Sequence, residues 1–530
     1  MQVIDKGELR MVVVSPYPAV DIPDMPLTAF VLERATEFGD KPALIDGPSG
    51  RTITYEELAG RVRALGAGLT ARDFGKGDCF AIYMPNLPEY AIAFHGVVSV
   101  GGIVTTVNPL YTADELGFQL KDSKARFLLT IPQFLDNARK AADNAGVEEV
   151  FVLGEAEGAT SVMELLTAGT DAPEVDFDVH NDLAVLPYSS GTTGFPKGVM
   201  LTHHNLVSNL QQFLGAQGID SSDSFIGLLP FFHIYGMTVL LNGGLRSGAT
   251  IVTIPRFDLE QFLELSQRYS TTRAYLVPPV ILALAKHPVV DNYDLSSIKL
   301  IMSGAAPLSG DLAAAASERL GCYVMQGYGL TETSPVTHVV PEDPAKNKPG
   351  SIGPPIPNTE CIVVDPASGE EVATDELGEV WIRGPQVMKG YLNNDAATSM
   401  TIDSHGWLHS GDIGRVDSDG YFFLVDRLKE LIKYKGMQVA PAELEALLLS
   451  HPQITDAAVI GVADEEAGEV PKAFVVLAGE LGEDDIKSYV ADRVAPHKRI
   501  RVVEVVEVIP KSASGKILRR LLKDKEATTR

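Results

Sequence analysis

A stretch rich in glycine and hydroxyl groups, from Tyr188 to Val199, constrains the fold more than any other part of the chain. It reads Tyr-Ser-Ser-Gly-Thr-Thr-Gly-Phe-Pro-Lys-Gly-Val. The apolar run Leu183 to Leu186 before it predicts a buried strand. Apolar residues at helical spacing after it predict a helix with Thr202 as its N-cap. We therefore expect a loop between a strand and a helix, and its N–H groups, hydroxyls and ammonium group suit a polyphosphate.

This loop differs from the common nucleotide-binding pattern, in which Gly and four further residues precede Gly-Lys-Ser/Thr. Here Phe195 and Pro196 separate Gly194 from Lys197. By composition alone, a surface turn would explain the stretch about as well. The order Ser-Ser-Gly-Thr-Thr-Gly-x-Pro-Lys-Gly resembles the phosphate loop of adenylate-forming enzymes, which include acyl-CoA ligases, firefly luciferase and peptide-synthetase adenylation domains. The resemblance implies that ATP or AMP is bound by Ser189, Ser190, Gly191, Thr192, Thr193, Gly194 and Lys197, with Thr193 also near the metal.

Charge and cysteine content exclude several classes of protein. The net charge of −26 argues against nucleic acid as a partner, and any ATP or CoA site must gather positive charge locally. Cys79, Cys322 and Cys361 lie far apart, so neither a disulfide framework nor a zinc site is indicated. We see no signal peptide and no membrane span. These features fit an enzyme of the cytoplasm, as a monomer or a homodimer.

The order of patterns along the 530 residues predicts an α/β fold with more than one domain. From 27 to 350, helical and strand patterns alternate, which predicts mixed sheets covered by helices. From about Gly353, short strands and turns indicate a β-rich subdomain. Beyond Asp426 we expect a compact α+β unit of about 100 residues. The predicted domains are therefore 1–425 and 426–530.

A second glycine-rich stretch, Gln326 to Thr333, reads Gln-Gly-Tyr-Gly-Leu-Thr-Glu-Thr. Glu332 stands where a dinucleotide fingerprint needs its third glycine, which excludes that motif. A tight turn after a strand is one interpretation, and a loop against a nucleotide is the second. In the adenylate-forming family, this motif implies nucleotide contacts by Gly327, by Tyr328 on adenine and by Thr331 on phosphate, with Glu332 holding Mg²⁺.

Two motifs before and after the predicted boundary carry further ligand residues. Asp412, in Ser-Gly-Asp, could belong to a simple turn, but the resemblance implies that it binds the ribose hydroxyls, with Arg427 nearby. The stretch from Asp426 to Glu443 gathers cations in a very acidic protein. The resemblance implies a hinge at Asp426. It further implies nucleotide contacts by Lys429 and Lys433, CoA contacts by Lys435 and Gly436, and support of acyl transfer by Gln438.

Lys516 lies in the basic turn Pro510 to Arg519. A lysine in such a turn is by default a surface charge. The family resemblance implies that Lys516 is catalytic, with its ammonium group between the carboxylate and the α-phosphate, where negative charge builds up.

The apolar segment Leu229 to Gly236 could form core or line an acyl pocket. We expect core packing for Phe231 and Ile234, whereas the polar tips of His233 and Tyr235 need partners or a cavity. The proposed acyl-site residues are His233, Tyr235, Gly304, Ala305, Gln326, Gly329, Pro335 and Val336. Arg256 could contact the CoA phosphates or be an ordinary surface charge.

Within the superfamily, the motifs most resemble those of 4-coumarate:CoA ligases, in particular the bacterial cinnamate and coumarate type. The resemblance implies a ligase that forms acyl-AMP from a small carboxylic acid, ATP and Mg²⁺, and then acyl-CoA from CoA. Thr238, Val239 and Met302 depart from the plant pattern, so the acid could instead be a medium- or long-chain fatty acid. The same motifs would also fit adenylation for a carrier protein, luciferase-like oxidation, or nucleotide binding without catalysis.

Overall fold

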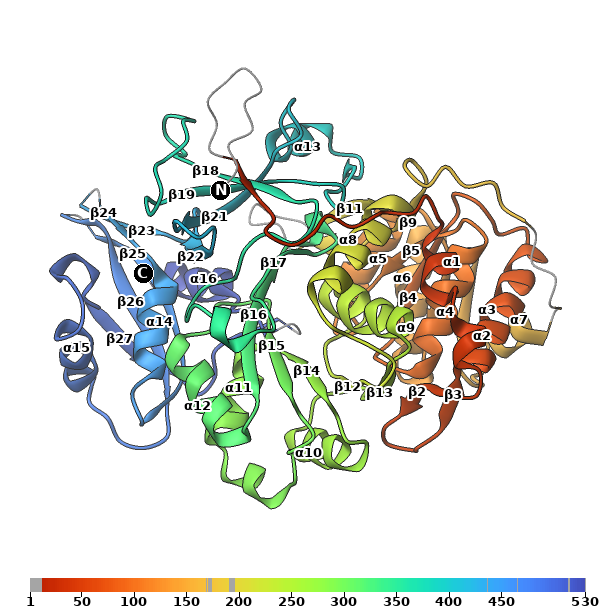
Figure 1. The fold of residues 1–530 in the computed structure, drawn as a ribbon, viewed down its shortest axis with the longest axis horizontal. Helices are drawn as coiled ribbons and strands as arrows, with labels where there is room; N and C mark the ends of the chain where they lie inside the picture. Colours follow the sequence, from red (N-terminus) through yellow and green to blue (C-terminus); the bar gives the residue numbers. More distant parts are fainter. Residues whose placement is uncertain are drawn as a thin grey trace.

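The computed structural model describes residues 12–529 apart from 168, 170–173, 190–195, 436, 465, 513 and 514. Figure 1 shows a large body built from the first four-fifths of the chain, with a smaller unit of the last hundred residues beside it. Both parts combine helices and sheets, which confirms the predicted fold class. Among the described residues, no helix has the length and apolar character needed to cross a membrane.

The largest sheet carries the phosphate loop at its edge. Its nine strands are β4 (Cys79–Tyr83), β5 (Ile103–Thr106), β6 (Ala125–Thr130), β7 (Glu149–Val152), β8 (Thr160–Ser161), β9 (Leu183–Val185), β10 (Tyr188–Ser189), β11 (Lys197–Thr202) and β20 (Gly390–Tyr391). Their order is β10-β11-β9-β5-β4-β6-β7-β8, and β20 pairs with β11. The centre is parallel, as predicted, whereas β11 runs antiparallel to β9, β10 and β20.

The expectation that the whole stretch from Tyr188 to Val199 is a loop between a strand and a helix is wrong at both ends, which form β10 and β11. The strand β11 intervenes, and its first residue, Lys197, lies opposite Ser189 of β10. Helix α8 (His203–Ala216) begins only after Thr202, whose hydroxyl accepts a hydrogen bond from Asn205 N, so the predicted N-cap is confirmed. A short apolar run such as Val199 to Leu201 does not distinguish a strand from the first turn of a helix.

Two further sheets belong to the large body. One holds β12 (Ser224–Gly227), β13 (Thr250–Thr253), β2 (Pro42–Asp46) and β3 (Thr52–Thr54), in this order. The other holds β14 (Arg273–Leu276), β15 (Leu300–Ser303), β16 (Tyr323–Gly329) and β17 (Val336–Val339). Ser303 pairs with Gln326, so the residues after β15 and the end of β16 share one edge. Because β16 continues through Gly329, the first half of the predicted second loop is strand.

The predicted β-rich subdomain is an antiparallel sheet. Its strands are β1 (Val13–Val14), β18 (Glu360–Val364), β19 (Gly378–Arg383), β21 (Leu408–Val416) and β22 (Phe422–Arg427). In the β21–β22 ladder, Asp412 is paired with Arg427. The sheet therefore brings the two motifs on either side of the predicted boundary into direct contact.

Most helices of the large body cover these sheets. They are α1 (Leu27–Leu32), α2 (Ala35–Phe38), α3 (Tyr55–Thr70), α4 (Pro88–Ser99), α5 (Ala113–Ser123), α6 (Leu135–Ala145), α7 (Met163–Thr167), α9 (Gly243–Ser247), α10 (Leu259–Arg268), α11 (Pro278–Lys286), α12 (Gly310–Leu320) and α13 (Asp395–Thr401). Capping boxes at Thr54 and Thr112 start α3 and α5. A π-helical segment, η2 (Tyr235–Asn242), and a short turn of 3₁₀-helix, η4 (Thr331–Thr333), adjoin the candidate site.

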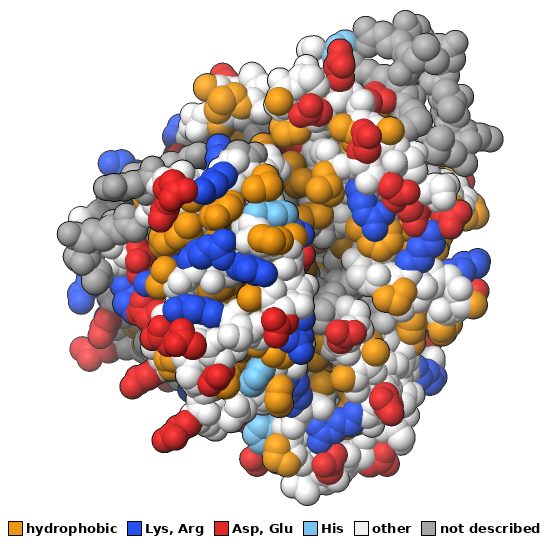
Figure 2. Space-filling model, turned by 90° about the vertical axis from the view of Figure 1, so that its left-hand side faces the viewer, with side chains coloured by type: hydrophobic (Ala, Val, Ile, Leu, Met, Phe, Trp, Pro, Cys, Tyr) orange, Lys and Arg blue, Asp and Glu red, His pale blue; other side chains and the backbone are white. Residues whose placement is uncertain are grey.

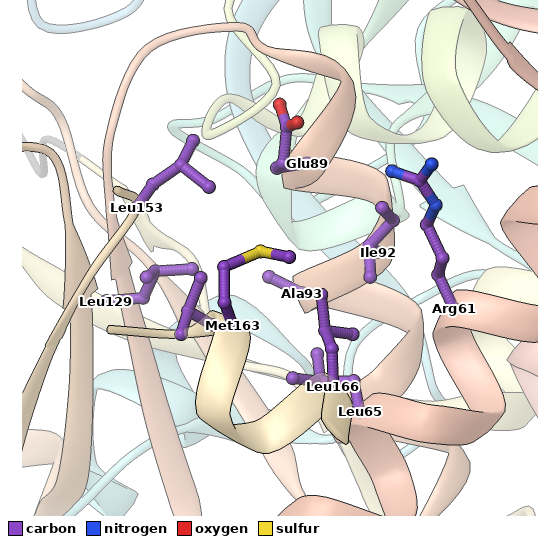
Figure 3. Close-up of a pocket in the computed structure, with 10 residues that line it drawn as sticks. Arg61, Leu65, Glu89, Ile92, Ala93, Leu129, Leu153, Met163 and Leu166 are labelled. Carbon is purple, nitrogen blue, oxygen red and sulfur yellow. The ribbon is translucent and has the colours of Figure 1, made fainter. Parts of the chain in front are cut away.

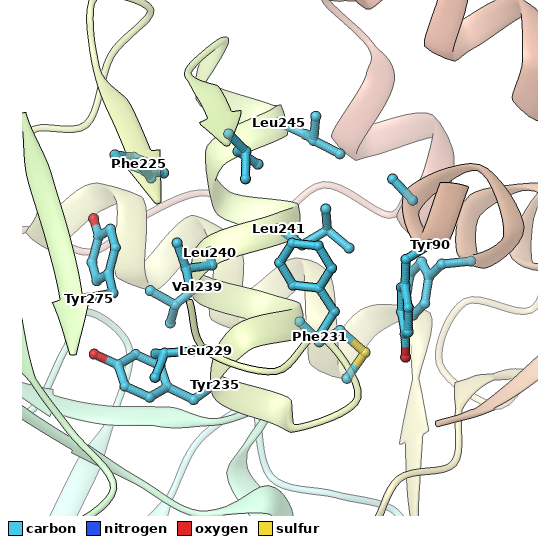
Figure 4. Close-up of a cluster of buried hydrophobic side chains, with 14 of the residues drawn as sticks. Tyr90, Phe225, Leu229, Phe231, Tyr235, Val239, Leu240, Leu241, Leu245 and Tyr275 are labelled. Atoms are coloured by element: carbon cyan, nitrogen blue, oxygen red, sulfur yellow. The ribbon is translucent and has the colours of Figure 1, made fainter. Parts of the chain in front are cut away.

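The core of the large body surrounds η2. In Figure 4, Val239, Leu240 and Leu241 lie between Tyr90 of α4 and Tyr275 of β14. Phe231 packs edge-to-face on Tyr90 with ring centroids 5.7 Å apart. Phe231 and Ile234 are buried, which confirms the expectation that they are core residues.

The C-terminal unit has a hydrophobic core of its own. Its elements are β23 (Ile432–Tyr434), β24 (Met437–Val439), α14 (Pro441–Leu449), β25 (Ile454–Asp464), β26 (Gly468–Leu477), α15 (Glu483–Ala491), β27 (Val502–Val505) and α16 (Arg519–Thr529). Leu444, Leu448, Val459 and Val475 belong to a buried cluster separate from the large core. A separate core is the feature expected of a unit that can move as one body.

Candidate active site

Lys516 is carried by a short hairpin of the C-terminal unit. Lys511 and Ile517 form an antiparallel bridge, and Ser512 N donates to the carbonyl of Lys516 at 2.8 Å. Gly515, with φ +78°, packs so closely on the large body that a Cβ there would lie 3.2 Å from Val277 Cγ2. Val277 directly follows β14, so the hairpin lies at the carboxyl end of a parallel sheet, where ligands of such sheets bind.

The charges around Lys516 are those of the predicted ligand residues. Burial lowers the pKa of Lys516 to about 8; the positive charge of Arg427 acts in the same direction, and Asp412 and Glu332 oppose it. Burial, with a smaller contribution from Lys516, lowers the pKa of His233 to about 4. The charge of Lys516 therefore interacts with residues predicted to bind ribose, metal and acid.

The predicted ribose site is tightly held. The hydroxyl of Tyr328 donates to Asp412 Oδ2, and Arg427 Nε lies 3.0 Å from Asp412 Oδ1. Burial, followed by the charge of Asp412, raises the pKa of Tyr328 well above its usual value, so its hydroxyl keeps its proton. Asp412 is only 5% exposed. A carboxylate can accept further hydrogen bonds beside these two, so it can still meet a diol.

The predicted phosphate and metal residues meet around Glu332. Glu332 Oε1 accepts hydrogen bonds from Ser189 Oγ (3.1 Å) and from the hydroxyl of Tyr391 (2.8 Å). Lys197 Nζ lies 4.0 Å from the ring centroid of Tyr391. Burial lowers the pKa of Lys197, Glu332 opposes this, and Lys429 adds to it. The site thus brings Lys197 and Glu332 to the edge where β11 begins, and the charge of Lys429 also acts on Lys197.

Five of the residues predicted to bind ATP lie outside the described residues. They are Ser190, Gly191, Thr192, Thr193 and Gly194. Their neighbours Ser189 and Lys197 fix both ends of the loop beside Glu332. The ends of the loop therefore lie beside the Gln326 to Thr333 stretch.

The two glycines at the end of β16 are required by packing within the protein. A Cβ on Gly329 would lie 2.1 Å from the carbonyl oxygen of Pro335, and one on Gly327 would lie 2.2 Å from Met302 Cε. Thr331 is half-buried at the start of η4. The glycines therefore let β16 approach its neighbours, in addition to any contact with a ligand.

Tyr235 links η2 to the end of β15. Its hydroxyl donates to the carbonyl of Met302 at 3.2 Å, and its ring fills the space where Gly304 lacks a side chain. Ala305 has φ +68°, so the chain turns sharply after Gly304. His233 Nδ1 accepts a hydrogen bond from Tyr235 N at 3.3 Å. These four acyl-site candidates are brought together.

The remaining acyl-site candidates have structural partners of their own. Gln326 Oε1 accepts from Leu308 N at 2.9 Å. The backbone of Val336 exchanges hydrogen bonds of 2.7 and 3.0 Å with the side chain of Asn209. The carbonyl of Pro335 accepts from the hydroxyl of Thr333 at 2.6 Å. Gln326, Pro335 and Val336 therefore form a fixed wall.

The predicted CoA residues Lys435 and Arg256 are exposed, whereas Lys516 is half-buried. Lys435, which is exposed and has φ +47°, pairs with Glu466. Lys433 and Gln438 face each other across the β23–β24 hairpin, both exposed, and Gly436 lies outside the described residues. Figure 1 shows this hairpin at the outer side of the C-terminal unit. Arg256 is exposed beyond β13 on the large body.

Asp426, in the last strand of the β-rich subdomain, binds the backbone of the C-terminal unit through its side chain. Its carboxylate accepts hydrogen bonds from Ala442 N (2.8 Å) and from Arg427 N (2.7 Å). Burial raises the pKa of Asp426, and Arg519 opposes this shift. Arg519 also pairs with buried Glu445.

Sequence reasoning missed three residues of this site. Tyr391, whose hydroxyl donates to Glu332, comes from β20, and nothing in its local sequence marks it. Arg519 and Glu445 pair across the C-terminal unit, and no local pattern joins them. The sequence signal for Arg519 was a charged side chain three residues after Lys516.

A small cavity in the large body is unrelated to this site. It lies among α3, α4 and α7, has a volume of about 30 Å³, and is lined mainly by apolar side chains (Figure 3). Glu89 and Arg61 stand at its polar side in Figure 3. The space suits about one water molecule, so it holds no substrate.

Comparison with known families matches both parts of the chain. Residues 31–392 match the AMP-binding enzyme family, and residues 443–516 match the AMP-binding enzyme C-terminal domain. The chain is 44% identical over 521 residues to 4-coumarate:CoA ligase 1 of Petunia hybrida, covering 96% of each protein. It is also 44% identical to 4-coumarate--CoA ligase 3 of Oryza sativa subsp. japonica, covering 96% of this chain and 94% of the relative.

Solved structures match along nearly the whole chain. The anthranilate CoA ligase AuaEII in complex with anthranoyl-AMP has a TM-score of 0.89 at 27% identity, covering 97% of this chain and 99% of that one. ATP-bound MatB from Rhodopseudomonas palustris has a TM-score of 0.85 at 29% identity, over 94% and 99% of the chains. The apo form of MatB scores 0.76 over 94% and 98%. The similarity over the whole chain is thus higher to the ATP-bound form of MatB than to its apo form.

Proposed function

Because the chain belongs to the AMP-binding enzyme family and is an ATP-dependent, AMP-forming acid:CoA ligase, we propose that its acid is a cinnamate or hydroxycinnamate. We also propose that domain 426–530 turns about Asp426 relative to domain 1–425 between the two half-reactions. The observation that carries the proposal is the close packing of Gly515, the neighbour of Lys516, on Val277 of the large body, together with the charge interactions of Lys516 with His233, Glu332 and Asp412.

In the first half-reaction, an oxygen of the carboxylate attacks the α-phosphorus of ATP, and pyrophosphate leaves. The charge of Lys516 interacts with the acyl-site residue His233 and with the nucleotide residues Asp412 and Glu332. An ammonium group there stabilises negative charge that develops on the α-phosphoryl oxygens. Lys197 and the loop from Ser189 hold the departing phosphates. Tyr328 and Asp412 orient the adenosine.

The residues around Glu332 fit a magnesium ion. Mg²⁺ prefers oxygen ligands, and the hydroxyls of Ser189 and Tyr391 hold the carboxylate of Glu332 through one oxygen. We propose Glu332 and Thr193 as the protein residues near this ion. When bound, Mg²⁺ would neutralise charge on the phosphate oxygens.

The second half-reaction needs a different set of residues at the same acyl group. The sulfur of CoA attacks the acyl carbon, AMP leaves, and Lys516 is no longer required. We propose that rotation about Asp426 withdraws Lys516 and brings Lys435, Gly436 and Gln438 to the site. The exposure of Lys435 and Gln438 on the β23–β24 hairpin, at the outer side of the C-terminal unit in Figure 1, supports this, because a movement of the unit would bring them to the acyl site.

CoA also requires positive charge in a protein with a net charge of −26. Figure 2, from the side on which the C-terminal unit lies, shows Lys and Arg side chains gathered on part of that face. We propose that Lys435 of this unit contacts the phosphates of CoA, and that Arg256 of the large body makes a smaller contribution.

Apolar side chains around Tyr235 support a ring-bearing acid. Val239 and Met302 are buried, and Gly304 leaves its space to the Tyr235 ring. The relatives at 44% identity are named as 4-coumarate ligases. A medium- or long-chain fatty acid is the second candidate, since the same apolar surface suits an alkyl chain.

The test is CoA-dependent thioester formation with cinnamate, 4-coumarate, benzoate, hexanoate and laurate. We expect kcat/KM for cinnamate or 4-coumarate to exceed that for the straight-chain acids by about 10-fold or more. A preference for a straight-chain acid by the same factor would replace the hydroxycinnamate assignment with the fatty-acid one. We expect the enzyme in the cytoplasm, as a monomer or homodimer.

A further inference from the structure

We propose that Asp24, His180 and His204 form a binding site for a divalent transition-metal ion such as Zn²⁺, separate from the active site. One carboxylate oxygen and one nitrogen of each imidazole all lie within 4.8 Å of one another. His180 Nε2 is 3.0 Å from Asp24 Oδ1, and His204 Nδ1 is 3.9 Å from the same oxygen. The two imidazole rings are 4.1 Å apart between centroids.

A simple hydrogen bond between Asp24 and His180 does not explain the whole cluster. His204 Nδ1 is buried, and among the described residues it has no hydrogen-bond partner. A buried polar nitrogen without a partner is costly. A metal ion between the three side chains would give this nitrogen a partner and would use the remaining lone pairs of Asp24.

Backbone contacts hold the three ligands near one another without an ion. Asp24 precedes α1, His180 lies in the turn before β9, and His204 is the second residue of α8. His204 N donates to the carbonyl of Val179 at 2.9 Å, and Leu27 N donates to His203 Nδ1 at 3.1 Å. Because these contacts join all three segments, the ion needs only side-chain adjustments to reach ligand distances of about 2.0–2.2 Å.

The donor set selects the class of ion. Two imidazole nitrogens and one carboxylate suit Zn²⁺, Co²⁺ or Ni²⁺, whereas Mg²⁺ and Ca²⁺ prefer oxygen ligands alone. With two neutral histidines and one carboxylate, the site carries a single negative charge. Asp24 and His180 are 72% and 53% exposed at their side chains, so water can complete the coordination. The ion would tie the segment before α1 to α8 and stabilise the large body.

The test uses the full-length, untagged protein and two probes, Co²⁺ and Zn²⁺. We expect Co²⁺ to give a visible absorption band that titrates with one ion per chain, and Zn²⁺ to displace it. Zn²⁺ at 100 times its Kd should raise Tm by about 2–4 °C. No saturable binding of either ion at one per chain would overturn the proposal.

The variants identify the ligands. His204→Gln and Asp24→Asn should each weaken binding by more than the roughly 10- to 100-fold that loss of an outer-shell partner costs, and should abolish the rise in Tm. His405→Gln, at an exposed histidine elsewhere, should bind as the parent does. Asp24→Asn changes an exposed side chain, so it reports on binding even if His204→Gln folds poorly. Parent-like binding by Asp24→Asn would overturn the site, and neither result bears on the ligase reaction.

Discussion

Arg519 Nη2 donates hydrogen bonds to both carboxylate oxygens of Glu445, at 2.8 and 2.7 Å, and this pair anchors one end of the hairpin that carries Lys516. At the opposite end, Lys511 Nζ lies 2.8 and 2.6 Å from the carboxylate oxygens of Asp456. Both anchors belong to the C-terminal unit. The position of Lys516 in the site is therefore set by the orientation of that unit as a whole.

The first prediction concerns the buried anchor. Arg519→Met leaves the carboxyl group of Glu445 buried without its cation, a change that costs about 3–5 kcal/mol in comparable pairs. We expect a lower Tm and, because a shift of about 1 Å at Lys516 matters, an adenylation rate reduced about 100-fold. Pyrophosphate release and thermal unfolding measure the two effects.

Arg520→Ala is the matched control for the anchor. Arg520 is the next residue, 77% exposed at its side chain, and pairs only loosely with Asp524 at 3.7 Å. Arg520→Ala should leave Tm nearly unchanged and should change the adenylation rate by no more than a small factor. An Arg519→Met protein that adenylates at the parent rate would show that the pair does not position Lys516.

The second prediction concerns pH. Lys516 has a pKa of about 8 in the folded protein, below its ordinary 10.5. Between these values the unfolded chain holds more protons, so the contribution of this group to stability increases as the pH rises. Activity changes in the opposite direction, since the charged form is the one that stabilises the transition state.

The pH dependence of adenylation tests this assignment. We expect kcat/KM for the acid to fall above pH 8 in the parent. In Lys516→Arg, whose guanidinium group stays charged, the fall near this pH should disappear, at a lower overall rate. If kcat/KM for Lys516→Arg also falls above pH 8, the group that titrates is not Lys516.

The third prediction compares two neighbouring glycines. Gly329→Ala places a Cβ 2.1 Å from the carbonyl oxygen of Pro335, which is backbone, whereas Gly327→Ala meets the flexible end of Met302. We expect Gly329→Ala to cost about 1–3 kcal/mol of unfolding free energy and Gly327→Ala clearly less. Thermal or denaturant unfolding measures the difference. Equal losses of unfolding free energy in the two variants would mean that β16 can shift away from Pro335 at no cost in free energy.

Local patterns were enough to predict much of this molecule. Thr202 could be assigned as a helix N-cap because capping depends on a few adjacent residues. The family resemblance implied that Arg427 lies near Asp412, and two neighbouring antiparallel strands bring the two residues together. The resemblance in ordered motifs supplied the family, since each motif combines several residue types at fixed spacing.

Contacts between distant segments could not be predicted. Val13 of β1 pairs with Cys361, and Tyr391 reaches Glu332, because tertiary packing brings them together. The strand β11 was missed for a different reason: a short apolar run has no period that separates strand from helix. The position of Lys516 in the site depends on the orientation of the C-terminal unit, which no local pattern encodes.

The central claim is that Lys516 serves one half-reaction and leaves for the other. The direct measurement is the rate of each half-reaction in Lys516→Ala, with Lys435→Ala as its counterpart. For Lys516→Ala we expect pyrophosphate release from ATP and acid to fall at least about 100-fold. Supplied acyl-AMP and CoA should still give acyl-CoA at about the parent rate. Lys435→Ala should release pyrophosphate at about the parent rate but should form acyl-CoA from supplied acyl-AMP much more slowly. Equal loss of both half-reactions in Lys516→Ala would contradict the account.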